Sequence, residues 1–300
     1  MTPELHDLLK REGPLPLARV MWLAARQYYS TREVFGRGGD FITAPEISQM
    51  FGELIGLSLA DLWLRAGRPE PVLLAEAGPG RGTLLADALR AVARAAPDFH
   101  AALRLHLIET SPRLRALQQE RLREAGLETG ATWHDSIDSL PEDAPLLLVA
   151  NEFLDALPIA QFEKLEDGWV LRRVTAGARF DRSVGANLAF IPGPLRAAAP
   201  GSIYERNFAA ERLAADIAAR LARQGGAALI LDYGYQGPHL GDTLQAIHQG
   251  CFADPLKTLG EADISAHVDF TAIAAAAARH ALVSGPDPQG AYLHHLGIEQ

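Results

Sequence analysis

The pattern of hydrophobic and polar positions along the chain changes near residue 71. Before that point, the stretches ELHDLLKRE, LARVMWLAARQYY and PEISQMFGELIGLSLADLWLRAG have a helical pattern. After it, short apolar runs alternate with helix-forming segments of roughly 10 to 15 residues. We therefore predict an α/β fold in which an N-terminal helical segment, residues 1–66, precedes a larger domain, residues 67–300, built on a doubly wound parallel sheet.

Two of the predicted strands are apolar runs that lead directly into a helix. PVLLAEAGPG precedes the helix TLLADALRAVARA, and LRLHLIET precedes the helix SPRLRALQQERLREAG. The strands ATWHDS and PLLLVANEF follow, and ERLAADIAARLARQGGAALILDYG supplies another helix and strand. This order is that of a Rossmann-like sheet, with PLLLVANEF as the fourth strand beside PVLLAEAGPG.

Two insertions interrupt this alternation, at about 159–200 and 236–265. The first contains AQFEKLEDGWVLRRVTAG, which we expect to form a β-hairpin with its turn at Asp167-Gly168. The second is rich in turn residues. After it, HVDFTAIAAAAARHAL predicts a helix capped by Asp269.

The stretch AEAGPGRGT joins a predicted strand to a predicted helix, which makes a backbone cradle at a helix N-terminus. A dinucleotide site has the spacing Gly-x-Gly-x-x-Gly and requires glycine where this chain has Thr83. The observed spacing is Glu76-x-Gly78-x-Gly80-x-Gly82. The acid suits the charged amino-acid portion of S-adenosylmethionine, while the glycines let the backbone approach the ligand. The alternative is that these glycines only allow a tight turn.

Polar residues also end the next two predicted strands. Glu109 ends LRLHLIET, where doubly wound nucleotide-binding proteins place a carboxylate for the ribose hydroxyls. Asp135 and Ser136 follow the third strand, at the place where an adenine amino group and ring nitrogen are reached. Together with the glycine loop, these residues favour a methyltransferase-type Rossmann domain.

The stretch LLLVANEFLDALP ends an apolar strand in Asn151, Glu152 and Asp155. The carboxyl end of this fourth strand faces the crevice where ligands bind, so we predict that these residues lie near the transferred methyl group. A carboxylate there can orient a guanidinium by a charge-assisted pair. Alternatively, Glu152 is solvated and Asp155 caps the next segment. Which carboxylate holds the substrate stays open, and Asp232 at the end of a later strand is a further candidate acid.

The loop GRGGDFITAPEIS is a candidate lid over the cofactor, with Gly39 and Asp40 as cofactor contacts. The alternative is a simple helix start with Pro45 at the first helical position, and both can hold together.

Composition and charge exclude several classes of protein. The net charge of −9 argues against a nucleic-acid-binding surface, and the absence of an apolar run of about 18 residues argues against a membrane span. Cys251 alone forms neither a disulfide nor a cysteine zinc site, and the histidines lack metal-ligand spacing, so no metal is expected. Neither a signal peptide nor a transit peptide is evident, and we expect a cytoplasmic protein.

Several stretches, in order, resemble the MidA-like protein arginine methyltransferases, a family of S-adenosylmethionine-dependent enzymes. They are YYSTREVFGRGGDFITAPEISQMFGELIG, AEAGPGRGT, HLIETSPRLRALQ, ANEFLDALPIAQFE, ALILDYGY and GEADISAHVDFTAIA. The resemblance covers nearly the whole chain and implies a class I methyltransferase fold with added helical and β segments. In mitochondrial members, which work in the matrix, it implies symmetric dimethylation of an arginine on a core subunit of respiratory complex I during assembly.

Carried over to this chain, the resemblance implies that Glu76 and the three loop glycines hold the cofactor and that Glu109 holds its ribose. Glu152 and its neighbours then face the target arginine of a protein substrate. Family members usually continue beyond QGAYLHHLGIEQ, so we expect a segment at the edge of the sheet to be missing here.

The expected function is therefore that of a protein arginine N-methyltransferase. Two alternatives remain: a non-catalytic assembly factor that keeps the cofactor-binding fold, and a methyltransferase that acts on a small molecule. The inserted β segment also leaves homodimerisation open.

Overall fold

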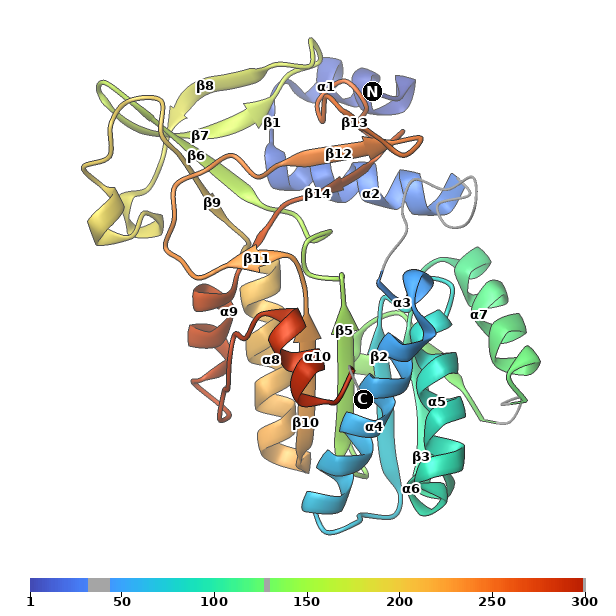
Figure 1. The fold of residues 1–300 in the computed structure, drawn as a ribbon. Coiled ribbons are helices and arrows are strands. Elements are labelled where there is room, and N and C mark those ends of the chain that lie inside the picture. The colour runs from blue at the N-terminus through green and yellow to red at the C-terminus, as the bar shows by residue number, and fades with distance from the viewer. Residues whose placement is uncertain (32–43, 127–129, 299–300) are drawn as a thin grey trace. The chain divides into compact units, whose positions relative to one another are not determined.

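The computed structural model describes residues 1–31, 44–126 and 130–298 of the chain (Figure 1). The chain separates into two compact units, each assembled from three stretches of sequence. Unit 1 comprises Met1–Phe41, Leu154–Ala214 and Asp232–Ala276, and unit 2 comprises Ile42–Phe153, Ala215–Leu231 and Ala277–Gln300. The predicted division at residues 66 and 67 does not coincide with any boundary between these units.

Unit 2 contains the parallel sheet that the sequence predicts. Its strand order is β10-β5-β2-β3-β4, with every pair parallel. The chain runs outward from β2 to β3 and β4 and then returns to β5 on the other side of β2, so the order of the strands reverses between β2 and β5. The strands are β2 (Val72–Ala77), β3 (Leu103–Ile108), β4 (Thr132–His134), β5 (Leu146–Asn151) and β10 (Gly226–Leu231).

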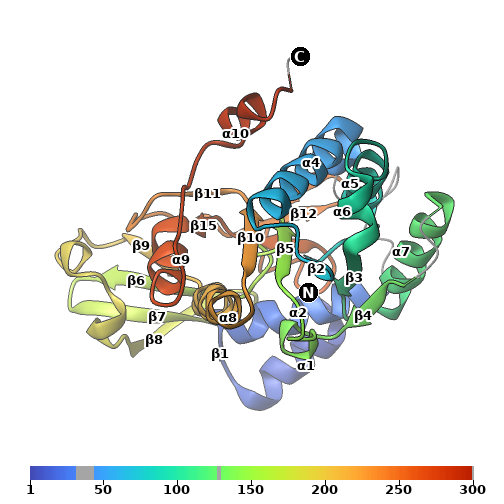
Figure 2. The same ribbon diagram turned by 90° about the horizontal axis from the view of Figure 1, so that it is seen from below.

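Helices cover both faces of this sheet. Figure 2 shows α4 and α5 on one face and α8 on the other. The predicted helix over residues 45–67 is divided at Ser48, and the short α6 was not predicted. The helices are α3 (Ala44–Ile47), α4 (Gln49–Arg65), α5 (Thr83–Ala95), α6 (Pro97–Ala102), α7 (Pro112–Glu124), α8 (Phe208–Gln224, whose second half belongs to unit 2), α10 (Gln289–His295) and the 3₁₀ turn η1 (Ile137–Ser139).

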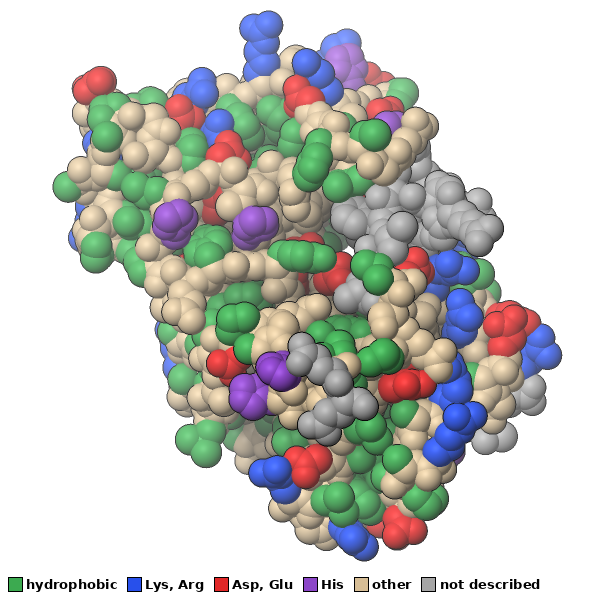
Figure 3. Space-filling model, in the orientation of Figure 1, with side chains coloured by type: hydrophobic (Ala, Val, Ile, Leu, Met, Phe, Trp, Pro, Cys, Tyr) green, Lys and Arg blue, Asp and Glu red, His purple; other side chains and the backbone are tan. Residues whose placement is uncertain are grey.

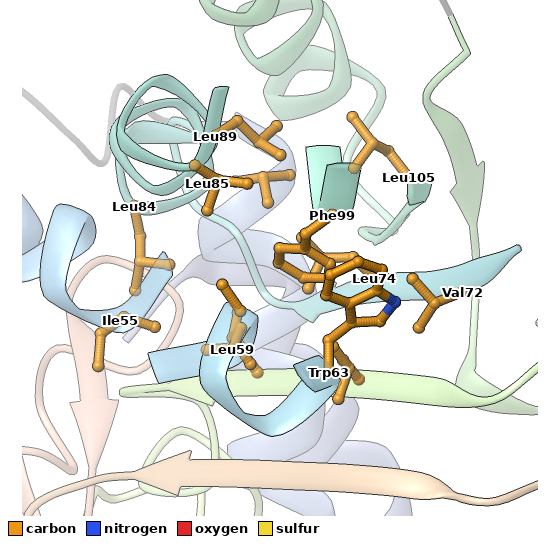
Figure 4. Close-up of a cluster of buried hydrophobic side chains, with 14 of the residues drawn as sticks. Ile55, Leu59, Trp63, Val72, Leu74, Leu84, Leu85, Leu89, Phe99 and Leu105 are labelled. Carbon is orange, nitrogen blue, oxygen red and sulfur yellow. The ribbon is translucent and has the colours of Figure 1, made fainter. Parts of the chain in front are cut away.

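The core of unit 2 lies between the sheet and the α4–α5 layer. All six residues of β2 are buried, as is usual for a central strand of a parallel sheet. Trp63 packs on Phe99 with the ring centroids 5.2 Å apart, and its indole N–H donates to the carbonyl oxygen of Pro69. Aliphatic side chains fill the space around this pair: Ile55, Leu59, Val72, Leu74, Leu84, Leu85, Leu89 and Leu105 (Figure 4).

Two glycines in α4 allow it to lie directly against α5. A Cβ atom on Gly52 would lie 2.7 Å from the Cβ atom of Asp87, and one on Gly56 would lie 2.7 Å from the carbonyl oxygen of Ala88. Both distances are too short for a side chain, so the spacing between these helices depends on the absence of one.

We expect Gly56→Ala to lower the free energy of unfolding by about 1–3 kcal/mol, because the added methyl group forces the backbones of α4 and α5 apart. Gly290→Ala in α10 is the matched control, since a Cβ there meets nothing within 4 Å. Urea titration of both variants measures the difference. Equal stability of the two variants would contradict the proposed close contact.

Unit 1 is built on an antiparallel sheet with the order β1-β7-β6-β9, in which β8 also pairs with β7. The predicted hairpin is present, but its turn lies at Glu166 and Asp167, one residue earlier than predicted, because Gly168 already pairs with Leu165. The elements are α1 (Pro3–Glu12), β1 (Leu15–Pro16), α2 (Leu17–Thr31), β6 (Ala160–Leu165), β7 (Gly168–Val174), β8 (Phe180–Gly185), the 3₁₀ turns η2 (Leu188–Phe190) and η3 (Gly193–Leu195), and β9 (Ile203–Arg206).

The second insertion and the residues that flank it also form strands in unit 1, which the turn-rich sequence did not predict. A small sheet has the order β13-β12-β14, and β11 pairs with β15. The predicted cap is confirmed, because the backbone N–H groups of Thr271 and Ala272 donate to Asp269 at the start of α9. These elements are β11 (Gly234–Tyr235), β12 (Gln245–His248), β13 (Cys251–Ala253), β14 (Asp263–Ser265), β15 (Val268–Asp269) and α9 (Phe270–Ala277).

A buried polar network connects the two insertions. The amide nitrogen of Gln161 on β6 donates to Glu205 on β9 and to Asp242, both at 2.7 Å. Arg172 on β7 donates to the amide oxygen of Gln161 at 2.8 Å and to Asp242 at 2.9 Å. Gln161 and Arg172 are buried, whereas Asp242 is exposed, so these bonds satisfy an amide and a guanidinium that water does not reach.

No helix among the described residues is long and apolar enough to cross a membrane.

Candidate functional site

The glycine loop follows β2 and turns sharply before α5. Gly78, Gly80 and Gly82 have φ angles of +63°, +53° and +78°, in the left-handed region that favours glycine. The N–H of Gly82 donates to the carbonyl oxygen of Pro79 at 2.7 Å, which closes the turn. A Cβ on Gly78 would lie 2.5 Å from the ring of Phe153. The three glycines are therefore required by the local geometry, and the loop presents bare backbone at the N-terminus of α5.

Glu76 lies on β2 just before this loop and is 4% exposed. Among the described residues, no hydrogen-bond donor reaches its Oε2 atom. Burial disfavours the charged carboxylate and raises the pKa of Glu76 to about 8. A buried carboxylate without a partner is costly for the fold, so its position fits a site that a cationic group completes. The ammonium of the amino-acid portion of S-adenosylmethionine is such a group.

Glu109 follows β3 and is also buried. Its Oε1 atom accepts a hydrogen bond from the N–H of Ser111 at 2.7 Å, and its Oε2 atom accepts one from Gln118 at 3.4 Å. Burial raises the pKa of Glu109, and these hydrogen bonds oppose that effect. The carboxylate is therefore held in one orientation at the carboxyl end of β3, as the ribose role requires.

Asp135 and Ser136 follow β4 at the same edge of the sheet, and both are exposed. Asp135 forms an ion pair with Arg115 of α7, with a distance of 2.6 Å between the nitrogen and oxygen atoms. The carbonyl oxygen of Ser136 accepts a hydrogen bond from the hydroxyl of Ser139 at 2.8 Å. The chain order and the sheet thus bring both residues to the predicted edge, and their contact with an adenine ring stays a prediction.

Gln118 is a residue that the sequence analysis missed. It is completely buried, and its amide nitrogen donates to the carbonyl oxygen of Gly80 at 2.8 Å. On α7 it occupies the buried stripe between Leu114 and Leu122, whereas the outer side of the helix carries charged side chains (Figure 3). A polar residue at an apolar position of the helical pattern was the signal available in the sequence.

Asn151 is the last residue of β5, which pairs with β2, and Glu152 follows it directly. Asn151 pairs in register with Leu231 of β10, and the N–H of Glu152 donates to the carbonyl oxygen of Leu231 at 2.9 Å. The φ angle of Glu152 is +48°, a left-handed conformation that costs a residue other than glycine about 1 kcal/mol or more. Such strained residues concentrate at functional sites. The predicted position of Glu152 at the carboxyl end of β5 is thus observed.

Asp155 belongs to unit 1. The structure shows a turn after it and then β6, so no helix begins there. Asp232, also in unit 1, accepts hydrogen bonds through Oδ2 from the N–H groups of Leu154 and Asp155, at 2.8 and 3.2 Å. Asp232 therefore holds the backbone of the LDALP segment.

The predicted lid residues Gly39 and Asp40 lie outside the described residues. Pro45 is the second residue of α3, one position after the predicted first helical position and still in the first turn. Beside it, Glu46 lies 3.6 Å from Arg81 of the glycine loop.

Comparison with known proteins gives consistent matches. Residues 54–286 match a family model described as "Putative S-adenosyl-L-methionine-dependent methyltransferase". The protein arginine methyltransferase NDUFAF7 homolog of Drosophila melanogaster is 34% identical over 99% of this chain and 74% of its own length. The human protein arginine methyltransferase NDUFAF7 is 32% identical over 100% of this chain and 74% of its own length.

A solved structure from Burkholderia thailandensis, with bound S-adenosyl-homocysteine, matches the whole chain. It has a TM-score of 0.79 and 27% sequence identity, and the match covers 84% of that chain. The predicted α/β methyltransferase fold and the predicted cofactor, S-adenosyl-L-methionine, are thereby confirmed.

Proposed function

Because the chain belongs to the MidA-like family of S-adenosyl-L-methionine-dependent methyltransferases, we propose that it transfers a methyl group to an arginine side chain of a protein. Relatives named protein arginine methyltransferases, at 32–34% identity, support the protein substrate and the arginine target. The observation that carries the proposal is the carboxylate of Glu152, held on strained backbone at the carboxyl end of β5, next to the glycine-loop strand.

Different residues of unit 2 bind different parts of the cofactor. Glu76 and the backbone of the glycine loop hold the amino-acid portion, and Glu109 binds the ribose hydroxyls. Asp135 and Ser136 contact the adenine. When bound, S-adenosyl-L-methionine supplies a methyl group on a positively charged sulfur.

Glu152 orients the substrate arginine. A carboxylate paired with two guanidinium N–H groups draws the positive charge toward itself and leaves lone-pair character on the attacking nitrogen. The enzyme then contributes mainly by positioning, because methyl transfer is an in-line displacement with little need for acid–base catalysis. Asn151 supports Glu152 at the end of β5, and Asp155 is the second candidate for the carboxylate role.

The proposed substrate is a core subunit of respiratory complex I, methylated during assembly. The mitochondrial relatives are named protein arginine methyltransferases, and the sequence motifs that resemble this family support the same target here. In this proposal the enzyme requires a protein partner and no nucleic acid.

Mass spectrometry of complex I subunits tests the substrate. Cells that express the wild-type protein, the Glu152→Gln variant or neither are compared for dimethylarginine on the core subunits. We expect the modification only with the wild-type protein. Dimethylarginine at the same level in all three would contradict the proposed substrate, and unimpaired assembly of complex I with the inactive variant would show that methylation is not what assembly requires.

A further inference from the structure

We propose that Gln118 is a positioning residue that presets the cofactor site, and that Trp133 fixes the orientation of its amide. The inference goes beyond the proposed substrate, and it rests on the proposed role of Glu109 in binding the ribose. Gln118 lies on α7, Trp133 on β4, Glu109 after β3 and Gly80 in the glycine loop, so a single side chain connects the segments that surround the site.

The orientation of the Gln118 amide follows from its contact with Trp133. The indole nitrogen of Trp133 lies 2.8 Å from the Oε1 atom of Gln118. An indole N–H only donates, so the atom that faces it is the amide oxygen. The NH₂ group of Gln118 therefore points the other way, toward the glycine loop and Glu109.

Both hydrogens of that NH₂ group have an acceptor in the cofactor site. One acceptor is the carbonyl oxygen of Gly80, at 2.8 Å, and the other is Oε2 of Glu109, at 3.4 Å. The longer distance indicates a weak bond, which orients the carboxylate and leaves it available to a further donor. Ser111 holds the other carboxylate oxygen at 2.7 Å, so Glu109 is fixed from two sides.

Burial makes this arrangement specific. Gln118 is 0% exposed, so water does not compete for its amide. Turning the amide over would set its oxygen against the Gly80 carbonyl and the Glu109 carboxylate and leave the indole N–H without an acceptor. The Trp133–Gln118 pair thus holds the ribose carboxylate and the loop backbone in one arrangement before the cofactor arrives, and this lowers the cost of binding.

Isothermal titration with two ligands tests this role. The ligands are S-adenosylhomocysteine and its analogue without the ribose 2′- and 3′-hydroxyls. We expect Gln118→Met, which keeps the side-chain length, to weaken S-adenosylhomocysteine about tenfold and the analogue less than about threefold. Gln119→Met, an exposed neighbour on α7, is the matched control and should bind both ligands as the wild type does.

A second variant allows the inference to be tested if Gln118→Met does not fold. Trp133→Phe leaves Gln118 in place, keeps an aromatic ring and removes the indole N–H that orients the amide, so we expect a smaller loss of the same selectivity. Equal weakening of both ligands by either folded variant would overturn the inference, as would unchanged binding of both. If Glu109→Gln keeps the wild-type preference for the hydroxyl-bearing ligand, the ribose role of Glu109 fails instead.

Discussion

Glu152→Gln is expected to lower the rate of methyl transfer by about 100- to 1,000-fold and to leave the affinity for S-adenosylhomocysteine within about threefold of the wild type. The substitution keeps the shape of the side chain and removes the negative charge that orients the guanidinium. Transfer of a labelled methyl group to the protein substrate measures the rate, and isothermal titration measures the affinity.

One further variant distinguishes the effect of the Glu152 carboxylate from the effect of its backbone conformation, and another serves as a control. Glu152→Gly suits the φ angle of +48° and should be as inactive as Glu152→Gln, while relieving backbone strain. Glu166→Gln, in the exposed turn between β6 and β7, is the matched control and should keep full activity. If the Glu152 variants retain activity, the carboxylate role passes to Asp155, which Asp155→Asn tests. Loss of cofactor affinity together with activity would give Glu152 a structural role.

Glu76→Gln is expected to weaken S-adenosylhomocysteine by about 10- to 100-fold at pH 8.5, because the amide does not carry the charge that pairs with the ligand ammonium. The pKa of Glu76 is about 8, so the wild-type affinity should rise between pH 6.5 and 8.5 as the carboxyl ionises. The variant should lack this rise. The amine of the ligand titrates in the same way in measurements on both proteins. The difference between the two pH profiles of affinity therefore reports the ionisation of Glu76.

The same substitution should stabilise the protein without ligand. The pKa of Glu76 in the fold lies above its ordinary value of 4.5, so the folded state holds this proton more tightly than the unfolded state does. The free energy of unfolding therefore falls as the pH rises from about 4.5 to 8, and Glu76→Gln removes that loss. We expect the variant to be more stable by about 2 kcal/mol or more at pH 8 and nearly equal to the wild type at pH 4.5. Thermal unfolding at the two pH values measures this, and a pH-independent difference would contradict it.

Local sequence was sufficient to predict much of unit 2. The helix over TLLADALRAVARA begins and ends where predicted, because Gly82 precedes it and Pro97 follows it closely. The parallel strand order followed from alternating strands and helices together with the position of the glycine loop. The positions of Glu76 and Glu109 beside the glycine loop could be predicted because each lies at the end of a strand that the sequence pattern shows.

Features that depend on contacts between distant residues were not predictable in this way. The three-residue strands β13 and β14 exist only because β12 lies between them, and the sequence of each is too short to indicate a strand. Gln118 acquires its role from Trp133 and Gly80, which lie 15 and 38 residues away. The left-handed backbone of Glu152 is imposed by its surroundings, since glutamate has no preference for it.

The buried network around Gln161 has a consequence for how members of this family can diverge. Gln161 and Arg172 come from the first insertion and Asp242 from the second, so each insertion satisfies polar groups of the other. A lineage that deleted the second insertion would remove the Asp242 carboxylate, which accepts hydrogen bonds from the buried side chains of Gln161 and Arg172. Deleting the first insertion would cost less, because Asp242 itself is exposed. The first insertion should therefore depend on the second more than the second depends on the first, although more than 30 residues of the common methyltransferase fold separate them along the chain.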